Sequence, residues 1–139
     1  YDISCSLVGS EMCIRDSVEG ELEKARTAGL HCSHLTGVGG TIRAAAKLCN
    51  DLSGADPDNR VIPVGEIKAL YKDLKKGDQD TLRQILRSVP DRVHTILPGL
   101  AILTAVLRAY EVETVSVSTC GVREGYLLNR VMGVKGSHE

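Results

Sequence analysis

The sequence has no phenylalanine and no tryptophan, and only four tyrosines among its 139 residues. Aromatic rings are the platforms on which the bases of single-stranded nucleic acids stack, so a protein of that class is not expected. The formal net charge of −1 also lacks the positive excess that general binding to a phosphate backbone requires. These absences exclude nucleic acid as an expected partner.

Long apolar runs are also missing. The most apolar stretch, 96–107, contains Pro98 and Gly99 and is too short to span a bilayer. We therefore expect a cytoplasmic protein without a membrane partner. What is present, 42% hydrophobic and 25% charged residues, is typical of a soluble globular chain with room for about one domain.

Cysteine is scattered, with five residues and no C-x-x-C pair. This spacing indicates neither a disulfide framework nor a zinc site, and it predicts that Cys32, Cys49 and Cys120 are small buried hydrophobes. His31 and His34 lie next to Cys32, but a metal ion requires three or four convergent ligands. We therefore predict no metal site in this chain.

The head of the chain has an unusual origin. Residues 6–17, with the sequence SLVGSEMCIRDS, back-translate into the transposase adapter of a sequencing library. Such a segment has never been selected to pack against a domain and is set aside from fold reasoning. We expect 1–17 to be non-native and without stable packing, and the native domain to occupy 18–139.

Apolar residues recur at helical spacing in five segments, which are 42–52, 67–74, 82–89, 93–107 and 122–132. Asp78 or Asp80 can cap the third helix, and the fourth is expected either to kink at Pro98 or to start there. Alternating β-favouring residues over 114–118 predict a strand, and a second strand is expected before residue 38. This order indicates an α/β layer structure.

The most informative segment is 33–41, which reads SHLTGVGGT and runs directly into a helical stretch. A strand that breaks on glycines and restarts as a helix exposes unpaired backbone N–H groups, which attract anions. The glycines permit positive φ and close approach of a ligand, and Thr41 can cap the helix and offer its hydroxyl to a phosphate. A tight turn without a ligand is the alternative interpretation.

Two further motifs follow, LPGLAIL at 97–103 and VSTCGVREG at 117–125. With the glycine loop, and over about 35–132, the chain resembles the exopolyphosphatase and guanosine pentaphosphate phosphohydrolase family. The resemblance implies the ribonuclease-H-like, actin-type ATPase superfold, in which two α/β domains close on a phosphate-bearing ligand. The chain is similar to the second domain only. The first half, which carries the catalytic acidic residues and the magnesium ligands, is expected upstream.

The resemblance also implies roles for individual residues. It implies phosphate binding by backbone N–H groups of the second-domain glycine loop, which comprises Gly37, Gly39, Gly40 and Thr41. Arg43 falls where the family has arginine or lysine, and it either pairs with a phosphate oxygen or points to water. No catalytic residue is expected within this chain.

The last motif begins the final helix. Arg123 and Glu124 match the family's Arg-Glu-Gly signature, and they either contact the ligand or form an ion pair that braces the helix. Gly125 is expected to allow close packing. Where many members have an aspartate, this sequence has Thr119, so a carboxylate is lost and a polar role for that turn is in doubt.

The activity that the resemblance implies is magnesium-dependent hydrolysis of a terminal phosphoanhydride, with polyphosphate or guanosine pentaphosphate as substrate. The chain alone is expected to be inactive, and a homodimer of the intact protein is one expected association. A non-catalytic module that binds a guanosine alarmone is the alternative, whereas the Arg-Glu-Gly signature argues against a sugar or acetate kinase.

A basic run across two helices either attracts a polyanion or is a solvated face; it comprises Lys72, Lys75, Lys76, Arg83, Arg87 and Arg92.

Overall fold

The computed structural model describes residues 3–25 and 31–133, with side chains at 13–24 and 31–133. The described elements, in chain order, are α1 (Ile3–Ala25), β1 (His34–Gly37), α2 (Gly40–Ser53), β2 (Val61–Pro63), α3 (Val64–Lys76), α4 (Gln79–Ser88), η1 (Pro90–Arg92), α5 (Ile96–Ala109), β3 (Thr114–Val117), α6 (Val122–Tyr126) and the π-helical turn η2 (Leu127–Val131). The predicted α/β class is confirmed.

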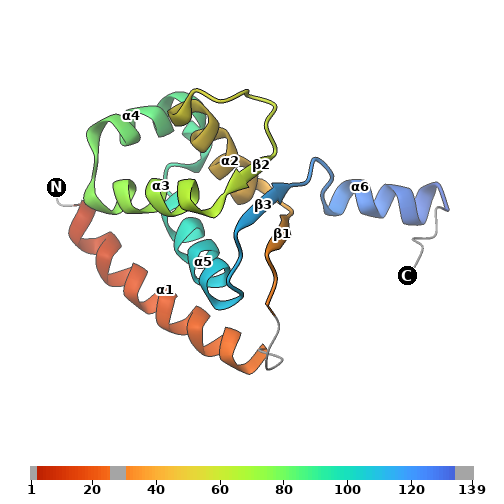
Figure 1. Ribbon diagram of the computed structural model, residues 1–139, viewed down its shortest axis with the longest axis horizontal. Helices are drawn as coiled ribbons and strands as arrows, with labels where there is room; N and C mark the ends of the chain where they lie inside the picture. Colours follow the sequence, from red (N-terminus) through yellow and green to blue (C-terminus); the bar gives the residue numbers. More distant parts are fainter. Residues whose placement is uncertain (1–2, 26–30, 134–139) are drawn as a thin grey trace.

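The three strands form one sheet in the order β1-β3-β2, in which β1 and β3 are parallel and β2 is antiparallel to β3. Because side chains alternate along a strand, each strand presents one face to the helices. Ile62 and Val115 lie on the covered face and are buried under α2, α3 and α5 (Figure 1), whereas Thr36 on the other face is exposed. The core therefore lies between the helices and a single face of the sheet.

Helices α2, α3, α4 and α5 follow the predicted apolar spacing. Asp78 is the N-cap of α4, where its carboxylate accepts a 2.9 Å hydrogen bond from the Thr81 N–H. Hydrogen bonds from the backbone N–H and the hydroxyl of Thr81 lower the pKa of this carboxyl. The helix that was expected to kink or start at Pro98 begins at Ile96 instead, so Pro98 lies in the first turn, where its missing N–H removes no helical hydrogen bond.

Strand β2 was not predicted, and its shortness explains why. It has three residues and ends in Pro63, so it presents neither a run of alternating residues nor a full set of donors. Its position depends on partners far away in the sequence, since the Val117 N–H donates to the Arg60 carbonyl at 2.8 Å and the Val64 N–H to the Glu113 carbonyl at 3.0 Å. Tertiary pairing, not local propensity, creates this strand.

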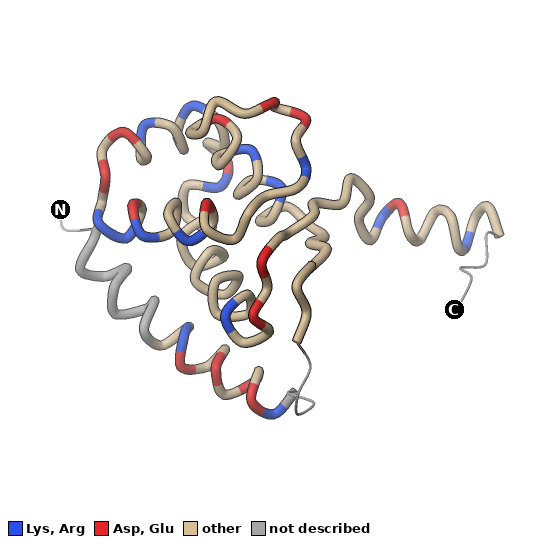
Figure 2. The backbone as a smooth tube through the Cα atoms, viewed as in Figure 1, with Lys and Arg blue, Asp and Glu red and all other residues tan. Residues whose placement is uncertain are grey.

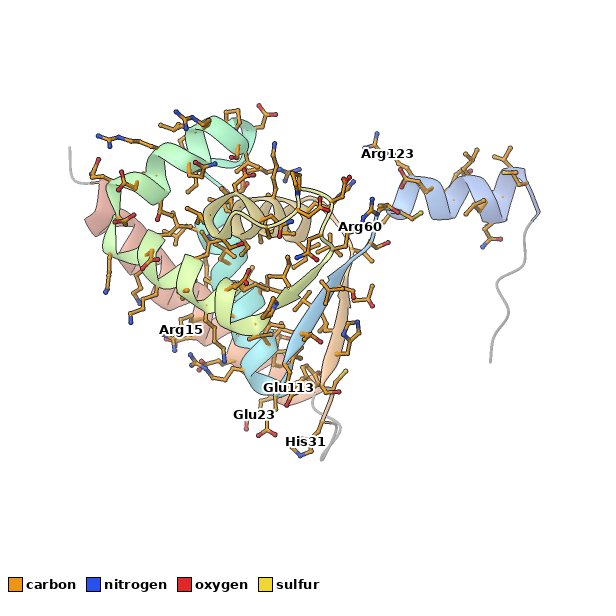
Figure 3. All side chains as sticks on the ribbon, turned by 45° about the horizontal axis from the view of Figure 1, so that its top comes forward. Arg15, Glu23, His31, Arg60, Glu113 and Arg123 are labelled. Atoms are coloured by element: carbon orange, nitrogen blue, oxygen red, sulfur yellow. The ribbon has the colours of Figure 1, made fainter. Side chains whose placement is uncertain are left out.

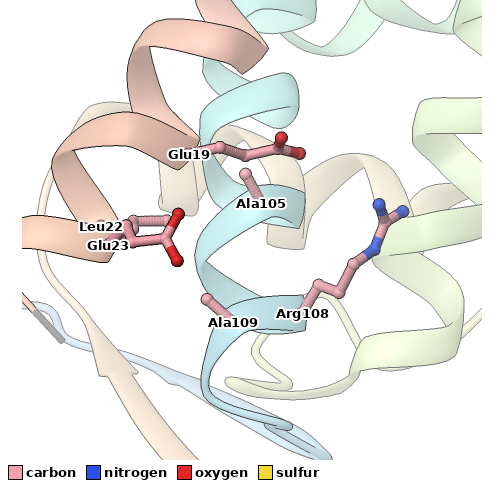
Figure 4. A pocket seen from close by; sticks show the side chains of 6 residues that line it. All are labelled: Glu19, Leu22, Glu23, Ala105, Arg108 and Ala109. Atoms are coloured by element: carbon pink, nitrogen blue, oxygen red, sulfur yellow. The ribbon is translucent and has the colours of Figure 1, made fainter. Parts of the chain in front are cut away.

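Helix α1 runs without interruption across the expected boundary between residues 17 and 18. It lies along α5, with a shallow groove between them that is lined by Leu22 and Glu23 of α1 and by Ala105 and Arg108 of α5 (Figure 4). No side chain at 13–24 is buried. Most of the side chains in the adapter-like segment lie outside the described residues, so the non-native origin of 1–17 stays a prediction.

The end of the described chain projects from the body. Helix α6 and η2 extend away from the other elements (Figure 1), and Val122 is 87% exposed. A Cβ on Gly125 would meet nothing within 4 Å, so the expectation of close packing at this glycine is wrong for the described residues. Within 3–25 and 31–133, no helix has the length and apolarity that a bilayer span demands.

Candidate anion site at the ends of the parallel strands

The two parallel strands end side by side, and each leads through a loop into a helix. The Ser118 N–H donates to the Gly37 carbonyl at 2.9 Å, which joins the ends of β3 and β1. The glycine loop continues from β1 into α2, and residues 118–121 continue from β3 into α6. In open α/β sheets, ligands bind outside the carboxyl ends of the parallel strands, and the predicted glycine loop lies at this edge.

The glycine loop takes its shape from Gly39, which has φ of 124° and ψ of −180°, a conformation that is open essentially only to glycine. Gly39 is the N-cap of α2, and its carbonyl accepts hydrogen bonds from the N–H and the Nε of Arg43 at 3.3 and 3.1 Å. The expectation that Thr41 caps the helix is wrong, because α2 begins one residue before it. As at the start of any α-helix, the first backbone N–H groups of α2 have no acceptor within the helix, and no side chain caps them.

The second motif packs directly against this turn. A Cβ on Gly99 would collide with the Thr41 methyl group, so only glycine lets α5 approach α2 this closely. At the neighbouring position, a Cβ on Gly40 would fall on the guanidinium of Arg92. Arg92 lies at the end of η1 and was predicted only as part of a basic run. No pattern in the sequence pointed to a role for Arg92 at the glycine loop.

The third motif reaches the same region from β3. The Glu124 carboxylate accepts a 2.7 Å hydrogen bond from the Gly121 N–H and so closes the first turn of α6. Hydrogen bonds from the backbone N–H groups of Glu124 itself and of Gly121 lower the pKa of this carboxyl, and the positive charges of Arg123 and Arg43 lower it further. Glu124 thus caps its helix, and the positive charge of Arg43 in the first turn of α2 acts on its carboxylate. Ligand contact by Arg123 or Glu124 stays a prediction.

The cap at Glu124 predicts a pH dependence. Since the pKa of this carboxyl is lowered on folding, the stabilisation by the cap is complete above the ordinary value of 4.5 and is lost as the pH falls through the lower folded value. We expect the amide resonance of Gly121 to titrate with a midpoint below 4.5 in ¹⁵N NMR spectra. Glu124→Gln should abolish this titration. A midpoint at or above 4.5 would contradict the capping role.

A small cavity adjoins the glycine loop on the side of β2. It has a volume of about 170 Å³ and lies between α2, the loop that precedes β2 and the end of β3. Arg43 and Arg60 both line it, and we call it the Arg43–Arg60 pocket. Figure 3 labels Arg60 near the end of β3 and Arg123 on the first turn of α6. No sequence pattern pointed to this pocket.

The histidines next to Cys32 have other partners. The two ring nitrogens of His34 lie 2.8 and 2.9 Å from the hydroxyl oxygens of Thr114 and Ser116, and His31 pairs with Glu111 at 2.8 Å. Among the described residues, no group of three or more histidine, cysteine or acidic side chains could hold a metal ion.

The cysteines differ in environment. Burial, followed by the negative charge of Glu66, raises the pKa of the Cys49 thiol to about 12, as expected for a small buried hydrophobe. Cys32 is half-buried, and Cys120 is exposed on the loop after β3, so the expectation of burial is wrong for Cys120.

The basic run follows α3 and α4 (Figure 2), apart from Arg92 at the glycine loop.

Comparison with known proteins agrees with this geometry. A family model described as the Ppx/GppA phosphatase family matches residues 10–132. The crystal structure of the Aquifex aeolicus family member is 28% identical, with a TM-score of 0.69 over 91% of this chain and 42% of that chain. A second Aquifex aeolicus structure, of a PPX-GPPA enzyme, is 28% identical, with a TM-score of 0.66 over 84% of this chain and 39% of that chain.

The chain thus spans about two-fifths of the length of these solved structures. A search of curated protein sequences found no match. The matched fold and the incomplete coverage agree with the expected single α/β domain of a two-domain superfold.

Proposed function

Because the chain belongs to the Ppx/GppA phosphatase family, we propose that it forms the second domain of a hydrolase that releases the terminal phosphate of inorganic polyphosphate or guanosine pentaphosphate. The observation that carries this proposal is the meeting of the glycine loop with Arg92 and Gly99 at the carboxyl ends of β1 and β3. Backbone donors and a cation at one point suit a phosphoryl group.

In this proposal, the N–H groups of the first turn of α2 hold phosphate oxygens, and Gly39 keeps the backbone open for their approach. The Arg92 guanidinium beside Gly40 adds positive charge where the transferred phosphoryl group is most negative. Water attacks the terminal phosphorus in line as the bridging P–O bond breaks, so that the shortened phosphate chain or nucleotide is the leaving group and orthophosphate is released. The carboxylate that positions this water is expected from the upstream half of the protein.

Magnesium belongs to the proposal only as a group that the family implies. It would neutralise charge on the phosphates, and its protein ligands are expected from the upstream half of the protein. We further propose a cytoplasmic protein, with homodimerisation as the expected association of the intact polypeptide.

The test is an assay of orthophosphate release from polyphosphate and from guanosine pentaphosphate. The 139-residue chain and a longer polypeptide that carries the upstream half are compared side by side. We expect release by the longer polypeptide and none by the chain alone. Turnover by the chain alone would overturn the division of roles, and tight binding without turnover by the longer polypeptide would favour the non-catalytic alarmone-binding module.

A further inference from the structure

One peptide unit of the glycine loop, between Gly39 and Gly40, decides whether this part of the loop offers a donor or an acceptor to an anion. A trans peptide is planar, with its carbonyl and its N–H on opposite sides, so the direction of the Gly39 carbonyl fixes the direction of the Gly40 N–H. Neither flanking residue has a Cβ, so no side chain at these two positions opposes a rotation of the peptide. Hydrogen bonds therefore have to fix its orientation.

Arg43 donates two hydrogen bonds to the Gly39 carbonyl. Its backbone N–H donates at 3.3 Å, longer than the usual distance of about 2.9–3.0 Å, and its Nε donates at 3.1 Å. Gly39 is the N-cap of α2 and has no side chain with which to cap the helix, in contrast to Asp78 at the start of α4. The side chain of Arg43 thus reinforces a weak backbone hydrogen bond at the point where the loop becomes a helix.

The place of the Arg43 Nε differs from that of a phosphate ligand. A group that binds the carbonyl of a peptide lies on the opposite side from its N–H, so this Nε faces away from an anion held by the Gly40 N–H. The cation beside Gly40 is Arg92, whose guanidinium lies where a Cβ on that glycine would fall. The positive charge of Arg43 also acts on the Glu124 carboxylate, whose pKa is lowered first by backbone hydrogen bonds and then by nearby arginines. The two arginines of the loop therefore stand in different relations to its donors.

We propose that Arg43 is a positioning residue of the glycine loop, whose side chain holds the Gly39–Gly40 peptide so that the Gly40 N–H faces a phosphate oxygen. With this peptide rotated by half a turn, the carbonyl oxygen would take the place of the N–H and repel the phosphate. The sequence left two roles open for Arg43, pairing with a phosphate or pointing to water, and holding the peptide is neither of them. This role rests on the proposed function for its ligand and goes beyond it, because it assigns Arg43 to the shape of the loop and Arg92 to its charge.

Two replacements of similar length separate a hydrogen-bonding role of Arg43 from a role of its charge. Glutamine has its Nε2 as many bonds from Cα as the arginine Nε, so Arg43→Gln keeps the donor and loses the charge, whereas Arg43→Met loses both. Each variant of the ¹³C,¹⁵N-labelled 139-residue chain is titrated with tripolyphosphate and followed by NMR. We expect Arg43→Met to weaken binding by about tenfold and to displace the signals of the Gly39 carbonyl carbon and the Gly40 amide before any ligand is added. Arg43→Gln should restore these signals and bring binding back to within about threefold of the unaltered chain.

Arg83→Met is the matched control, because it removes an exposed arginine from α4, and it should change neither the loop signals nor the binding. Equal weakening by Arg43→Gln and Arg43→Met would overturn the positioning role, since the charge would then carry the effect. Unchanged loop signals and binding in Arg43→Met would overturn it as well.

A chain that does not bind tripolyphosphate at all would contradict the proposed function, and the ligand-free spectra still decide the role of Arg43. Signals of Gly39 and Gly40 that are displaced in Arg43→Met and in place in Arg43→Gln support the positioning role. Any other pattern of these signals overturns it.

Discussion

Replacing Gly39 and Gly40 by valine, in a polypeptide that carries both halves of the phosphatase region, is expected to lower kcat for phosphate release by roughly 10²–10³-fold. This corresponds to about 2.7–4 kcal/mol, the cost of losing one backbone donor to the developing charge. At Gly39 the φ of 124° excludes valine, and at Gly40 the new side chain displaces the Arg92 guanidinium. Phosphate release under saturating substrate measures the effect.

Two further variants make this prediction specific. Arg92→Ala keeps both glycines and removes only the guanidinium, so its loss of activity separates the contribution of the cation from that of the backbone. Gly65→Val in α3 is the matched control, because a Cβ there meets nothing within 4 Å. Thermal unfolding of each variant shows whether the fold survives. A folded double variant with unimpaired turnover would contradict the role of the loop.

Leu100→Ala in α5 is expected to cost about 2–5 kcal/mol of the free energy of unfolding. Leu100 is fully buried, at 0% exposure, in the core that joins α2, α3 and α5 to the sheet. Such a loss is a large fraction of the roughly 5–15 kcal/mol that stabilises an ordinary domain. Urea unfolding followed by circular dichroism measures the shift in midpoint.

The same substitution at Leu86 provides the control for this effect. Leu86 lies on α4 and is 61% exposed, so Leu86→Ala removes little buried apolar surface. We expect a change within about 0.5 kcal/mol. Equal destabilisation by the two variants would mean that the core described between the helices and the sheet is not what holds the chain together.

The exposed apolar residues at the end of the described chain, in α6 and η2, affect the choice of polypeptide for the kinetic experiment. Tyr126 of α6, Val131 of η2 and Met132 directly after η2 are each more than 60% exposed, and further exposed apolar residues lie between them at Leu127 and Leu128. A helix that is apolar all round is normally buried. Since the chain spans about two-fifths of the solved relatives, a longer polypeptide is the appropriate protein for kinetic work.

The sequence by itself predicted the helices from α2 onward, because each depends on apolar residues three and four positions apart, whereas α1 was not predicted. It also narrowed the cap of α4 to Asp78 or Asp80 and predicted a strand over 114–118 and the glycine break between β1 and α2, since spacing, capping residues and glycine are local signals. Three motifs in order were enough to indicate the family. Thr41 was misassigned as a cap because the sequence does not fix the first residue of a helix more closely than about one or two positions.

Only the tertiary structure decided which groups meet. Strand β2 exists because its backbone pairs with β3, and Arg92 reaches Gly40 because α5 packs closely against α2 through Gly99. The Arg43–Arg60 pocket draws its walls from α2, the loop before β2 and the end of β3. Contacts between residues far apart in sequence depend on packing of the whole domain, and no local pattern of residues encodes them.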